Sequence, residues 1–461
     1  MGLWWPEDGW CHAAAGRSVP AGIAGSTTGA DLRVLLTGAT GLIGRAVLAG
    51  LAGEGHDVVA IARGTGASQL LPQAARCIAL DIAQATEPVQ WLPHLAGIDA
   101  VVNCAGVLQD GPRDSTAGVH TRGPAALFAA CEQAGVRRVV QMSAVGVDRD
   151  SAVTAFARSK RAGDEALMAR DLEWVVLRPS VVVGRQAYGG SALFRGLAAL
   201  PLVPRVRDTG PMQIVQLDDL VRTVLFFLRA DAPTRVALEI VGPEALSLDE
   251  VLAAYRRWLG FGRPRFVSVP RWAEATAFRI GDLIGRLGWR PPLRSTTRAE
   301  IGRGATGDPG PWQRLTGMAP RALGAALAAE PASVQERRFA RLYLLKPVVL
   351  ATLSLFWIVS GLVTLGPGWE EGVRLVQSTM FTAAAPLAAA GAIADLLIGV
   401  GVAIRRTAKV ALLAGVALSV GYLGLATVLL TGLWTDPLGS LVKVLPIIVL
   451  HLVALAILDE R

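Results

Sequence analysis

The feature that most constrains the fold is a glycine-rich turn between two apolar segments, Thr37-Gly38-Ala39-Thr40-Gly41-Leu42-Ile43-Gly44. The apolar run 34–36 precedes it, and an Ala-rich stretch, 45–52, follows it. This order predicts a strand, a tight turn and a helix whose free N–H groups and dipole face a pyrophosphate. The spacing is G-x-x-G-x-x-G and not the general G-x-G-x-x-G dinucleotide fingerprint, so an ordinary strand–helix turn remains the alternative.

Further apolar runs follow at intervals that leave room for helices between them. Because each run is continuously apolar, it is typical of a strand buried on both faces of a parallel sheet. The fold class predicted is therefore α/β, a doubly wound parallel sheet of the Rossmann kind, with ligands at the carboxyl ends of its strands. The predicted strands after the first are 58–61, 77–80, 100–104, 139–142, 174–177 and 236–241.

The residues that end the second and third strands bear on the choice of cofactor. An acidic residue after the second strand would bind the ribose hydroxyls of NAD, whereas this chain has Arg63 there with no acid beside it in the sequence. A guanidinium suits a 2′-phosphate, so NADP(H) is favoured over NAD(H), with a solvated loop arginine as the alternative. Asp81, after the third strand, is either an acceptor for the adenine amino group or a turn residue.

Taken together, these segments resemble the short-chain dehydrogenase/reductase superfamily in its extended and atypical branches, from Leu32 to Leu259. The matching segments are Thr37–Gly44, Asn103–Gly106, Ser143, Ser159–Ala162, Leu177–Ser180 with Gly184, and Val215–Leu220. The resemblance implies an NAD(P)-binding domain with Ser143 and Lys160 as catalytic residues. The cofactor-binding residues it implies, together with those above, are Thr37, Gly38, Thr40, Gly41, Leu42, Ile43, Gly44, Arg63, Asp81, Ile82, Cys104, Ala105, Gly106, Lys160, Pro179 and Val181.

The catalytic tyrosine of the family is missing. It should lie four residues before Lys160, on the same helix face, but that position is Phe156. Phenylalanine cannot transfer a proton, so only ribose binding remains for Lys160, and Ser143 alone is a weak acid. His120 and Asp110 are polar candidates for the missing acid, and a surface histidine and a loop aspartate are the alternatives.

The C-terminal part of the chain is strongly apolar. It contains four apolar runs, which predict an all-α four-helix transmembrane bundle, with a buried helical bundle as the alternative. The runs are Leu342–Leu365, Met380–Ile404, Val410–Leu433 and Val444–Leu458, of which the fourth is short but can extend back to Leu441. From Phe339 this part resembles the DoxX-like membrane family, and the combination resembles a bacterial family of membrane-anchored reductases. The net charge of +8 is attributed to residues flanking the spans and not to nucleic-acid binding.

The basic residues around these runs predict a multi-pass protein of the inner (cytoplasmic) membrane. They precede the first span and separate the second from the third, which predicts that the N-terminal domain and the C-terminus are cytoplasmic. Two polar residues, Asp395 and His451, fall at similar depths inside the second and fourth spans. Since intramembrane ionisable residues usually face the bundle interior and pair, we expect these two to face each other or to line one polar cavity.

These observations divide the chain into a disordered leader (1–31), an NAD(P)-binding domain (32–260), a cap or connector (261–338) and a four-span DoxX-like domain (339–461). The function predicted is a membrane-anchored NADP(H)-binding oxidoreductase acting on a lipophilic carbonyl or quinone. The alternative is a non-catalytic NADP(H)-binding sensor or accessory subunit, resembling the nucleotide-binding accessory subunit of respiratory complex I. The predicted partners are the lipid bilayer and a lipophilic small molecule or a membrane protein complex. No nucleic acid or metal is predicted.

Overall fold

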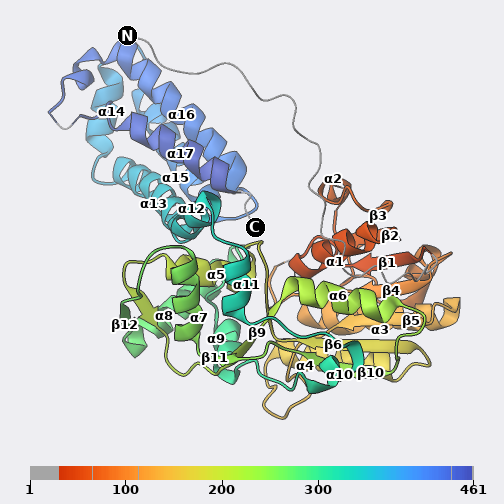
Figure 1. The fold of residues 1–461 in the computed structure, drawn as a ribbon. Coiled ribbons are helices and arrows are strands. Elements are labelled where there is room, and N and C mark those ends of the chain that lie inside the picture. The colour runs from red at the N-terminus through yellow and green to blue at the C-terminus, as the bar shows by residue number, and fades with distance from the viewer. Residues whose placement is uncertain (1–30, 65, 113, 438, 459–461) are drawn as a thin grey trace, which may run out of the picture.

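The structure is a computed structural model that describes residues 31–64, 66–112, 114–437 and 439–458. The predicted leader lies outside these residues, apart from Asp31. The centre of the fold is a seven-stranded parallel sheet with the order β10-β6-β5-β4-β1-β2-β3 (Figure 1). The strands are β1 (Arg33–Thr37), β2 (Asp57–Ala62), β3 (Arg76–Ala79), β4 (Ala100–Asn103), β5 (Arg138–Met142), β6 (Glu173–Pro179) and β10 (Val236–Ile240). The predicted doubly wound sheet is confirmed.

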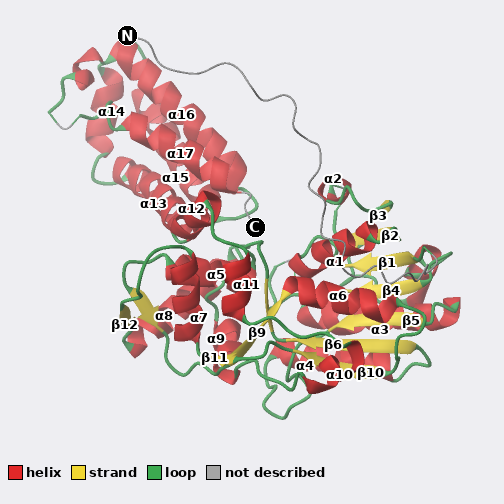
Figure 2. Ribbon diagram, in the orientation of Figure 1, coloured by secondary structure: helices red, strands yellow, loops and turns green. Residues whose placement is uncertain are grey.

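Helices cover both faces of this sheet (Figure 2). On one face, α1 (Leu42–Gly53) and α6 (Leu217–Leu228) bury their apolar sides against alternate residues of the central strands. On the other, α3 (Gly123–Ala134) and α4 (Ala155–Met168) do the same. Short helical turns complete the connections: α2 (Ala67–Leu70), η1 (Pro88–Gln90), η2 (Leu92–His94) and η3 (Gly118–Arg122). The strand order reverses between β1 and β4, which is where such folds bind their ligands.

A second, smaller layer follows the carboxyl end of β6. Its strands form two small sheets, β7 (Val181–Val183) with β9 (Met212–Gln216) and β11 (Ala245–Leu246), and β8 (Val203–Arg205) with β12 (Phe266–Ser268). Helices α5 (Gly189–Ala198) and α7 (Leu248–Trp258) pack on them around a third apolar core. A capping box, in which Ser247 and Glu250 bind each other's backbone N–H groups, begins α7.

The region predicted as a cap or connector packs on two of these cores, the one beneath α1 and α6 and the one of the second layer. It contains α8 (Arg271–Arg286), α9 (Ser295–Arg303), α10 (Gly310–Thr316), α11 (Leu323–Ala329) and α12 (Val334–Tyr343). Trp312 of α10 is fully buried in the core of α1 and α6, and its indole N–H donates to Thr223 at 3.1 Å. Leu323 of α11 is buried in the core of the second layer. We therefore propose that the connector folds with the N-terminal domain, and not as a separate lobe.

The C-terminal part is a helical bundle, drawn in blue in Figure 1. Its main helices are α13 (Leu345–Leu365), α15 (Ala384–Ala403), α16 (Ala408–Leu429) and α17 (Val444–Leu458), with α14 (Trp369–Gln377) and η4 (Thr431–Trp434) in the connections. In the described residues, α13, α15 and α16 are long and apolar enough to cross a membrane. Within the described residues, the fourth predicted span forms a 15-residue helix, about 22 Å long at about 1.5 Å per residue, against a hydrocarbon core of roughly 30 Å.

The predicted direct pairing of Asp395 with His451 is wrong. Asp395 of α15 accepts hydrogen bonds from Ser360 at 2.8 Å and from Tyr422 at 3.4 Å. The imidazole of His451 accepts from the indole N–H of Trp357 at 2.8 Å, and its other nitrogen lies 2.7 Å from the Ile447 carbonyl oxygen of its own helix. Both residues face the bundle interior, as expected, but α13 supplies a separate partner to each.

The bundle meets the N-terminal part at the loop between α15 and α16. The indole N–H of Trp289, just after α8, donates to the Ala403 carbonyl at 2.7 Å, and the Arg405 amide donates to the Leu287 carbonyl at 3.1 Å. The Arg405 guanidinium stacks on the Trp289 ring at 5.4 Å. The chain itself makes the other connection, because α12 of the connector leads directly into α13.

Candidate functional site

The glycine turn after β1 brings the backbone unusually close to its neighbours. Gly38 has φ of +66°, and a Cβ there would lie 2.6 Å from the carbonyl carbon of Cys104. At Gly44 a Cβ would lie 2.2 Å from the Gly38 carbonyl oxygen. Only glycine fits both positions. Helix α1 then begins with Gly41 as its N-cap and no side-chain cap, so the first-turn N–H groups and the dipole can serve an anion. This cradle fits a dinucleotide pyrophosphate.

A row of buried polar side chains crosses the sheet at the carboxyl ends of β1, β4 and β5. The Thr37 hydroxyl bonds the Asn103 side-chain oxygen, and the Asn103 amide donates to Gln141 at 2.7 Å. The Asn103 oxygen also accepts from the Ala105 amide at 3.2 Å, which fixes the backbone of Cys104 and Ala105 beside the glycine turn. The sequence analysis did not identify Gln141 as a site residue. Its position two residues before Ser143 does not indicate that its side chain bonds Asn103 on the adjacent strand.

Lys160 and Ser143 occupy adjacent buried positions at this edge of the sheet. The Lys160 ammonium donates to the Met142 carbonyl at 2.7 Å and contacts the Ala105 carbonyl at 3.4 Å. Burial lowers its pKa to about 8, although Asp164 and Cys104 act in the opposite direction. Burial also raises the pKa of the Cys104 thiol to about 12, so this cysteine is a neutral neighbour of Lys160 at neutral pH.

The structure adds an aspartate and an arginine to this group. The Ser143 hydroxyl donates to Asp164 at 2.8 Å, and the same carboxylate oxygen accepts from Arg178 at 3.2 Å. Asp164 is fully buried, and burial raises its pKa against the opposing effects of Ser143 and Arg178. The spacing of Lys160 and Asp164, four residues apart on α4, was a signal in the sequence that both face the same way.

Phe156, in the position of the missing tyrosine, packs edge-on against His120 with ring centroids 5.5 Å apart. The Val107 amide donates to one imidazole nitrogen at 3.0 Å, so the other nitrogen carries the proton and donates to Ser159 at 2.9 Å. Burial, followed by the nearby Lys160, lowers the pKa of His120 to about 2. His120 is therefore neutral with both nitrogens engaged, which argues against it as the substitute acid.

Asp110, the other candidate acid, holds its own loop together. One of its carboxylate oxygens accepts from the backbone amide of Thr116 at 2.6 Å and from the hydroxyl of the same residue at 3.0 Å. This bonding favours the structural alternative of a loop aspartate.

Arg63 lies directly after β2, where the sequence placed it, but an acid lies beside it. Asp114, from the loop after β4, is 2.9 Å from the Arg63 guanidinium and 2.6 Å from that of Arg290. The two arginines are about half exposed, whereas Asp114 is mostly buried between them. No sequence pattern indicated Arg290 here, because it comes from the connector, more than two hundred residues after Arg63.

The remaining predicted cofactor residues line the same carboxyl edge of the sheet. Asp81 accepts from the Ala83 amide at 3.1 Å, an Asx turn that leaves its second oxygen for a ligand. Three of the others lie at the glycine turn: Thr40, Leu42 and Ile43. Ile82 follows Asp81, and Gly106 lies near the Lys160 ammonium. Pro179 and Val181 lie on either side of the β6–β7 junction.

The fold and this edge define the class: a doubly wound dinucleotide-binding domain joined to a bundle of apolar helices. Residues 38–196 match the family profile described as NAD(P)H-binding, and residues 354–452 match the DoxX-like family. The chain therefore combines an NAD(P)H-binding domain with a DoxX-like membrane domain and is a membrane protein.

Curated proteins and solved structures are similar to part of this chain. An uncharacterised protein of Mycobacterium tuberculosis is 29% identical over 258 residues, which is 55% of this chain but only 27% of that protein's length. The ceramide reductase of Caulobacter vibrioides is 24% identical over 253 residues, covering 54% of this chain and 77% of that enzyme. Among solved structures, the Bordetella bronchiseptica enzyme WbmG in complex with NAD superposes with a TM-score of 0.50 at 19% identity, covering 66% of this chain and 94% of WbmG. This last likeness concerns the fold alone.

Proposed function

We propose that the protein is a membrane-anchored NADP(H)-dependent oxidoreductase that acts on a lipophilic carbonyl compound or quinone. The observation that carries the proposal is the buried group of Ser143, Lys160 and Asp164 beside the glycine cradle, on a chain that also has membrane helices. When bound, the reduced nicotinamide would supply a hydride. The protein must then orient the substrate oxygen and give it a proton.

Two residues can divide these tasks without a tyrosine. Lys160 has three N–H donors, of which two face the Met142 and Ala105 carbonyls, so one remains for a substrate oxygen or a cofactor ribose. With a pKa of about 8, its ammonium is a far better acid at neutral pH than an ordinary lysine. The Ser143 hydroxyl donates to Asp164, so its oxygen is held in place as an acceptor for a hydroxyl group, such as the alcohol formed from the carbonyl.

The preference for NADP(H) is the second part of the proposal. Arg63 and Arg290 flank the place where the adenosine ribose of such folds ends, and Asp114 holds both guanidinium groups there. A 2′-phosphate carries more charge than a carboxylate and offers more acceptor oxygens, so it can replace Asp114 as the partner of both arginines. We therefore assign the 2′-phosphate to Arg63 and Arg290 together.

The membrane side of the proposal follows from the contact of the bundle with the N-terminal part. The loop that carries Arg405 and Arg406 lies against Leu287 and Trp289. This contact supports the placement of that basic loop and the nucleotide site on the same, cytoplasmic, side of the inner membrane. A ceramide reductase among the relatives supports a lipid substrate, and bilayer attachment would concentrate such molecules near the site.

Cofactor binding and turnover on the full-length protein in nanodiscs test the proposal. We expect NADPH to bind more tightly than NADH. Arg63→Ala and Arg290→Ala should each weaken NADPH by about 10- to 100-fold, the loss of one hydrogen bond to a charged group, and leave NADH nearly unchanged. Arg137→Ala is the matched control, because Arg137 is exposed and pairs with Asp171 and Glu173 near the opposite ends of the strands. Equal affinity of the parent protein for the two cofactors would refute the NADP(H) preference.

The packing of Phe156 on His120 favours a second candidate, a non-catalytic NADP(H)-binding module. Turnover separates the two candidates. A reductase should oxidise NADPH in the presence of long-chain aldehydes, ketolipids or quinones, and Lys160→Met should abolish this activity. NADPH binding with no turnover across that panel would select the binding module.

A further inference from the structure

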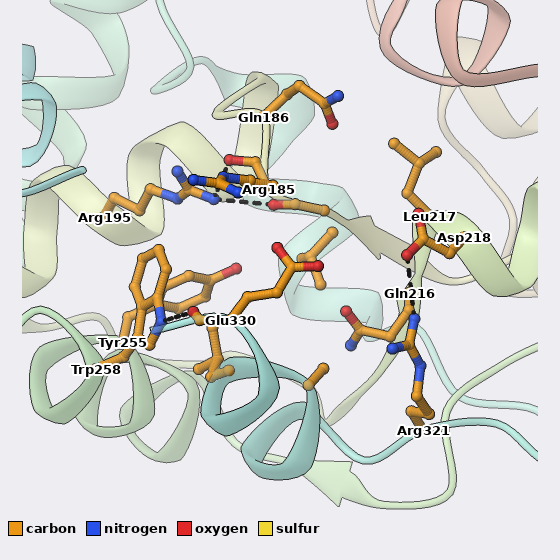
Figure 3. A pocket seen from close by; sticks show the side chains of 14 residues that line it. Arg185, Gln186, Arg195, Gln216, Leu217, Asp218, Tyr255, Trp258, Arg321 and Glu330 are labelled. Carbon is orange, nitrogen blue, oxygen red and sulfur yellow. Dashed lines mark hydrogen bonds and ion pairs between the residues drawn. The ribbon is translucent and has the colours of Figure 1, made fainter. Parts of the chain in front are cut away.

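A small cavity lies in the second layer, away from the nucleotide site. It has a volume of about 160 Å³ and opens between α5, α7 and α11, where β7 and β9 end (Figure 3). Neither the glycine turn nor Ser143 nor Lys160 lines it. The cavity is therefore not part of the site described above.

Arg195 of α5 forms one wall and is buried, with the Tyr255 hydroxyl as a hydrogen-bond partner and the Glu336 carboxylate near enough to favour its charge. Only 3% of the surface of Arg195 is exposed to solvent. Its guanidinium donates to the carbonyls of Gly184 and Arg185, each at 2.9 Å, and stacks 5.1 Å from the Trp258 ring. Its Nε has no hydrogen-bond partner, and no carboxylate of the described chain forms an ion pair with it. A buried charge is costly unless it is paired.

Gln216 brings an unsatisfied donor to the same cavity, and Arg321 brings a second guanidinium. Gln216, the last residue of β9, is 7% exposed, and its side-chain N–H₂ group has no partner. Arg321 lies on the other side, where its terminal nitrogen pairs with Asp218 at 3.3 Å and its Nε lies 3.6 Å from Asp219, so it adds positive charge at the edge but no free donor. Figure 3 shows Gln216 and Arg321 across the cavity from Arg195. Buried donors normally have acceptors.

Acidic residues on the rim do not supply that acceptor. Asp218 is already paired with Arg321. Glu330, just after α11, is exposed and lines the cavity with its carboxylate between Arg195 and Gln216 (Figure 3), but it forms no ion pair with Arg195. Glu336 of α12 is held by Ser333 and lies 3.9 Å from Arg185, outside the cavity. The Nε of Arg195 and the side-chain nitrogen of Gln216 are therefore left for a ligand.

We propose that this cavity binds a phosphate monoester group through Arg195 and Gln216, with Arg321 at its edge. A nucleotide or another drug-sized ligand needs a pocket of roughly 300–1,000 Å³, so the cavity accommodates only the anionic head of a larger molecule or a small free anion. A tetrahedral oxyanion offers acceptors in several directions, as donors from two separate elements require.

The position of the cavity is compatible with two origins of the bound phosphate group. Helix α5 packs against α12, where a Cβ on Gly196 would lie 2.5 Å from the Tyr343 ring, and α12 leads into the first membrane helix. The phosphate is therefore either the headgroup of an anionic phospholipid or a free phosphate ester from the same aqueous phase.

Thermal unfolding of the full-length protein in phosphatidylcholine nanodiscs provides the test. Inorganic phosphate, compared with chloride at equal ionic strength, should raise the apparent Tm, because a ligand that binds only the native state stabilises it. Gln216→Glu, which places a carboxylate among the donors, should abolish the shift. In calorimetry, Gln216→Met should weaken phosphate binding by about 10- to 100-fold, the effect of losing one hydrogen bond to a charged group. Gln186→Glu is the matched control, because Gln186 is exposed at the rim.

Discs that contain phosphatidic acid distinguish the two sources. If the headgroup is the ligand, these discs should raise the Tm of the parent protein without added phosphate, and free phosphate should add little. If a free ester is the ligand, only dissolved phosphate should act. Gln216→Met keeps the test valid should Gln216→Glu fail to fold. The proposal is overturned if neither probe shifts the Tm, or if the shifts in the Gln216 variants equal those in Gln186→Glu.

Discussion

Replacing Gly44 by alanine should damage both the fold and the cofactor cradle. A Cβ at this position would lie 2.2 Å from the Gly38 carbonyl oxygen, 2.7 Å from its carbonyl carbon and 2.9 Å from the Ala39 Cα. Non-bonded carbons are best about 3.5–4.0 Å apart, so these carbon contacts are short by roughly 0.6 Å or more. All three atoms belong to the backbone, so no side chain can move aside, and α1 must shift away from the turn.

The expected cost is that of overpacking, about 1–3 kcal/mol or more. For a domain of this size, 1 kcal/mol corresponds to roughly 2–4 °C in Tm, which predicts a fall of about 2–12 °C. Gly53→Ala is the control, because it makes the same change in the same helix at a position where a Cβ would meet nothing within 4 Å. It should raise the Tm slightly, since alanine favours helix over glycine by up to about 1 kcal/mol.

The assay is thermal unfolding of both variants and the parent protein in the same nanodiscs, together with NADPH titration. Gly44→Ala should lose Tm and NADPH affinity together, because the displaced helix moves its N-terminal amides away from the pyrophosphate. If Gly44→Ala behaved like Gly53→Ala in both measurements, the reasoning from the close backbone contacts would be refuted.

Two further predictions concern the group around Lys160. Phe156→Tyr should restore a tyrosine acid and raise turnover of a carbonyl substrate by about 10²-fold or more, measured as kcat with NADPH; an unchanged kcat with intact NADPH binding would contradict the assigned site. Stability should also depend on pH in two windows. Burial raises the pKa of Asp164 in the folded protein above its unfolded-state value of about 3.9. Between these two pKa values the unfolding free energy should fall as pH rises, because the folded state binds more protons. Asp164→Asn should remove this fall. The pKa of Lys160 is lowered to about 8, so stability should rise from about pH 8 towards the unfolded-state pKa of about 10.4, and Lys160→Met should flatten that rise in a pH series of Tm values.

The sequence by itself determined the sheet and the glycine turn. Continuous apolar runs are the direct signature of strands buried on both faces, and the observed strands β2 to β6 and β10 coincide with the predicted runs to within two residues at either end. The requirement for glycine at positions 38 and 44 is likewise local, since it comes from backbone that lies only a few residues away or on the adjacent strand. Apolar run length also indicated the membrane helices, including the short fourth one, whose predicted run Val444–Leu458 coincides with α17.

Only the tertiary structure decided which polar groups meet. Arg63, Asp114 and Arg290 come together from the end of β2, the loop after β4 and the connector, and no periodicity relates such distant positions. The same holds for Arg195, Gln216 and Arg321 around the second cavity, and for the separate partners that α13 gives to Asp395 and His451. Apolar patterns fix which face of an element is buried, because that depends on local spacing. Hydrogen bonds depend on distances of about 3 Å, which are set only when the elements have packed.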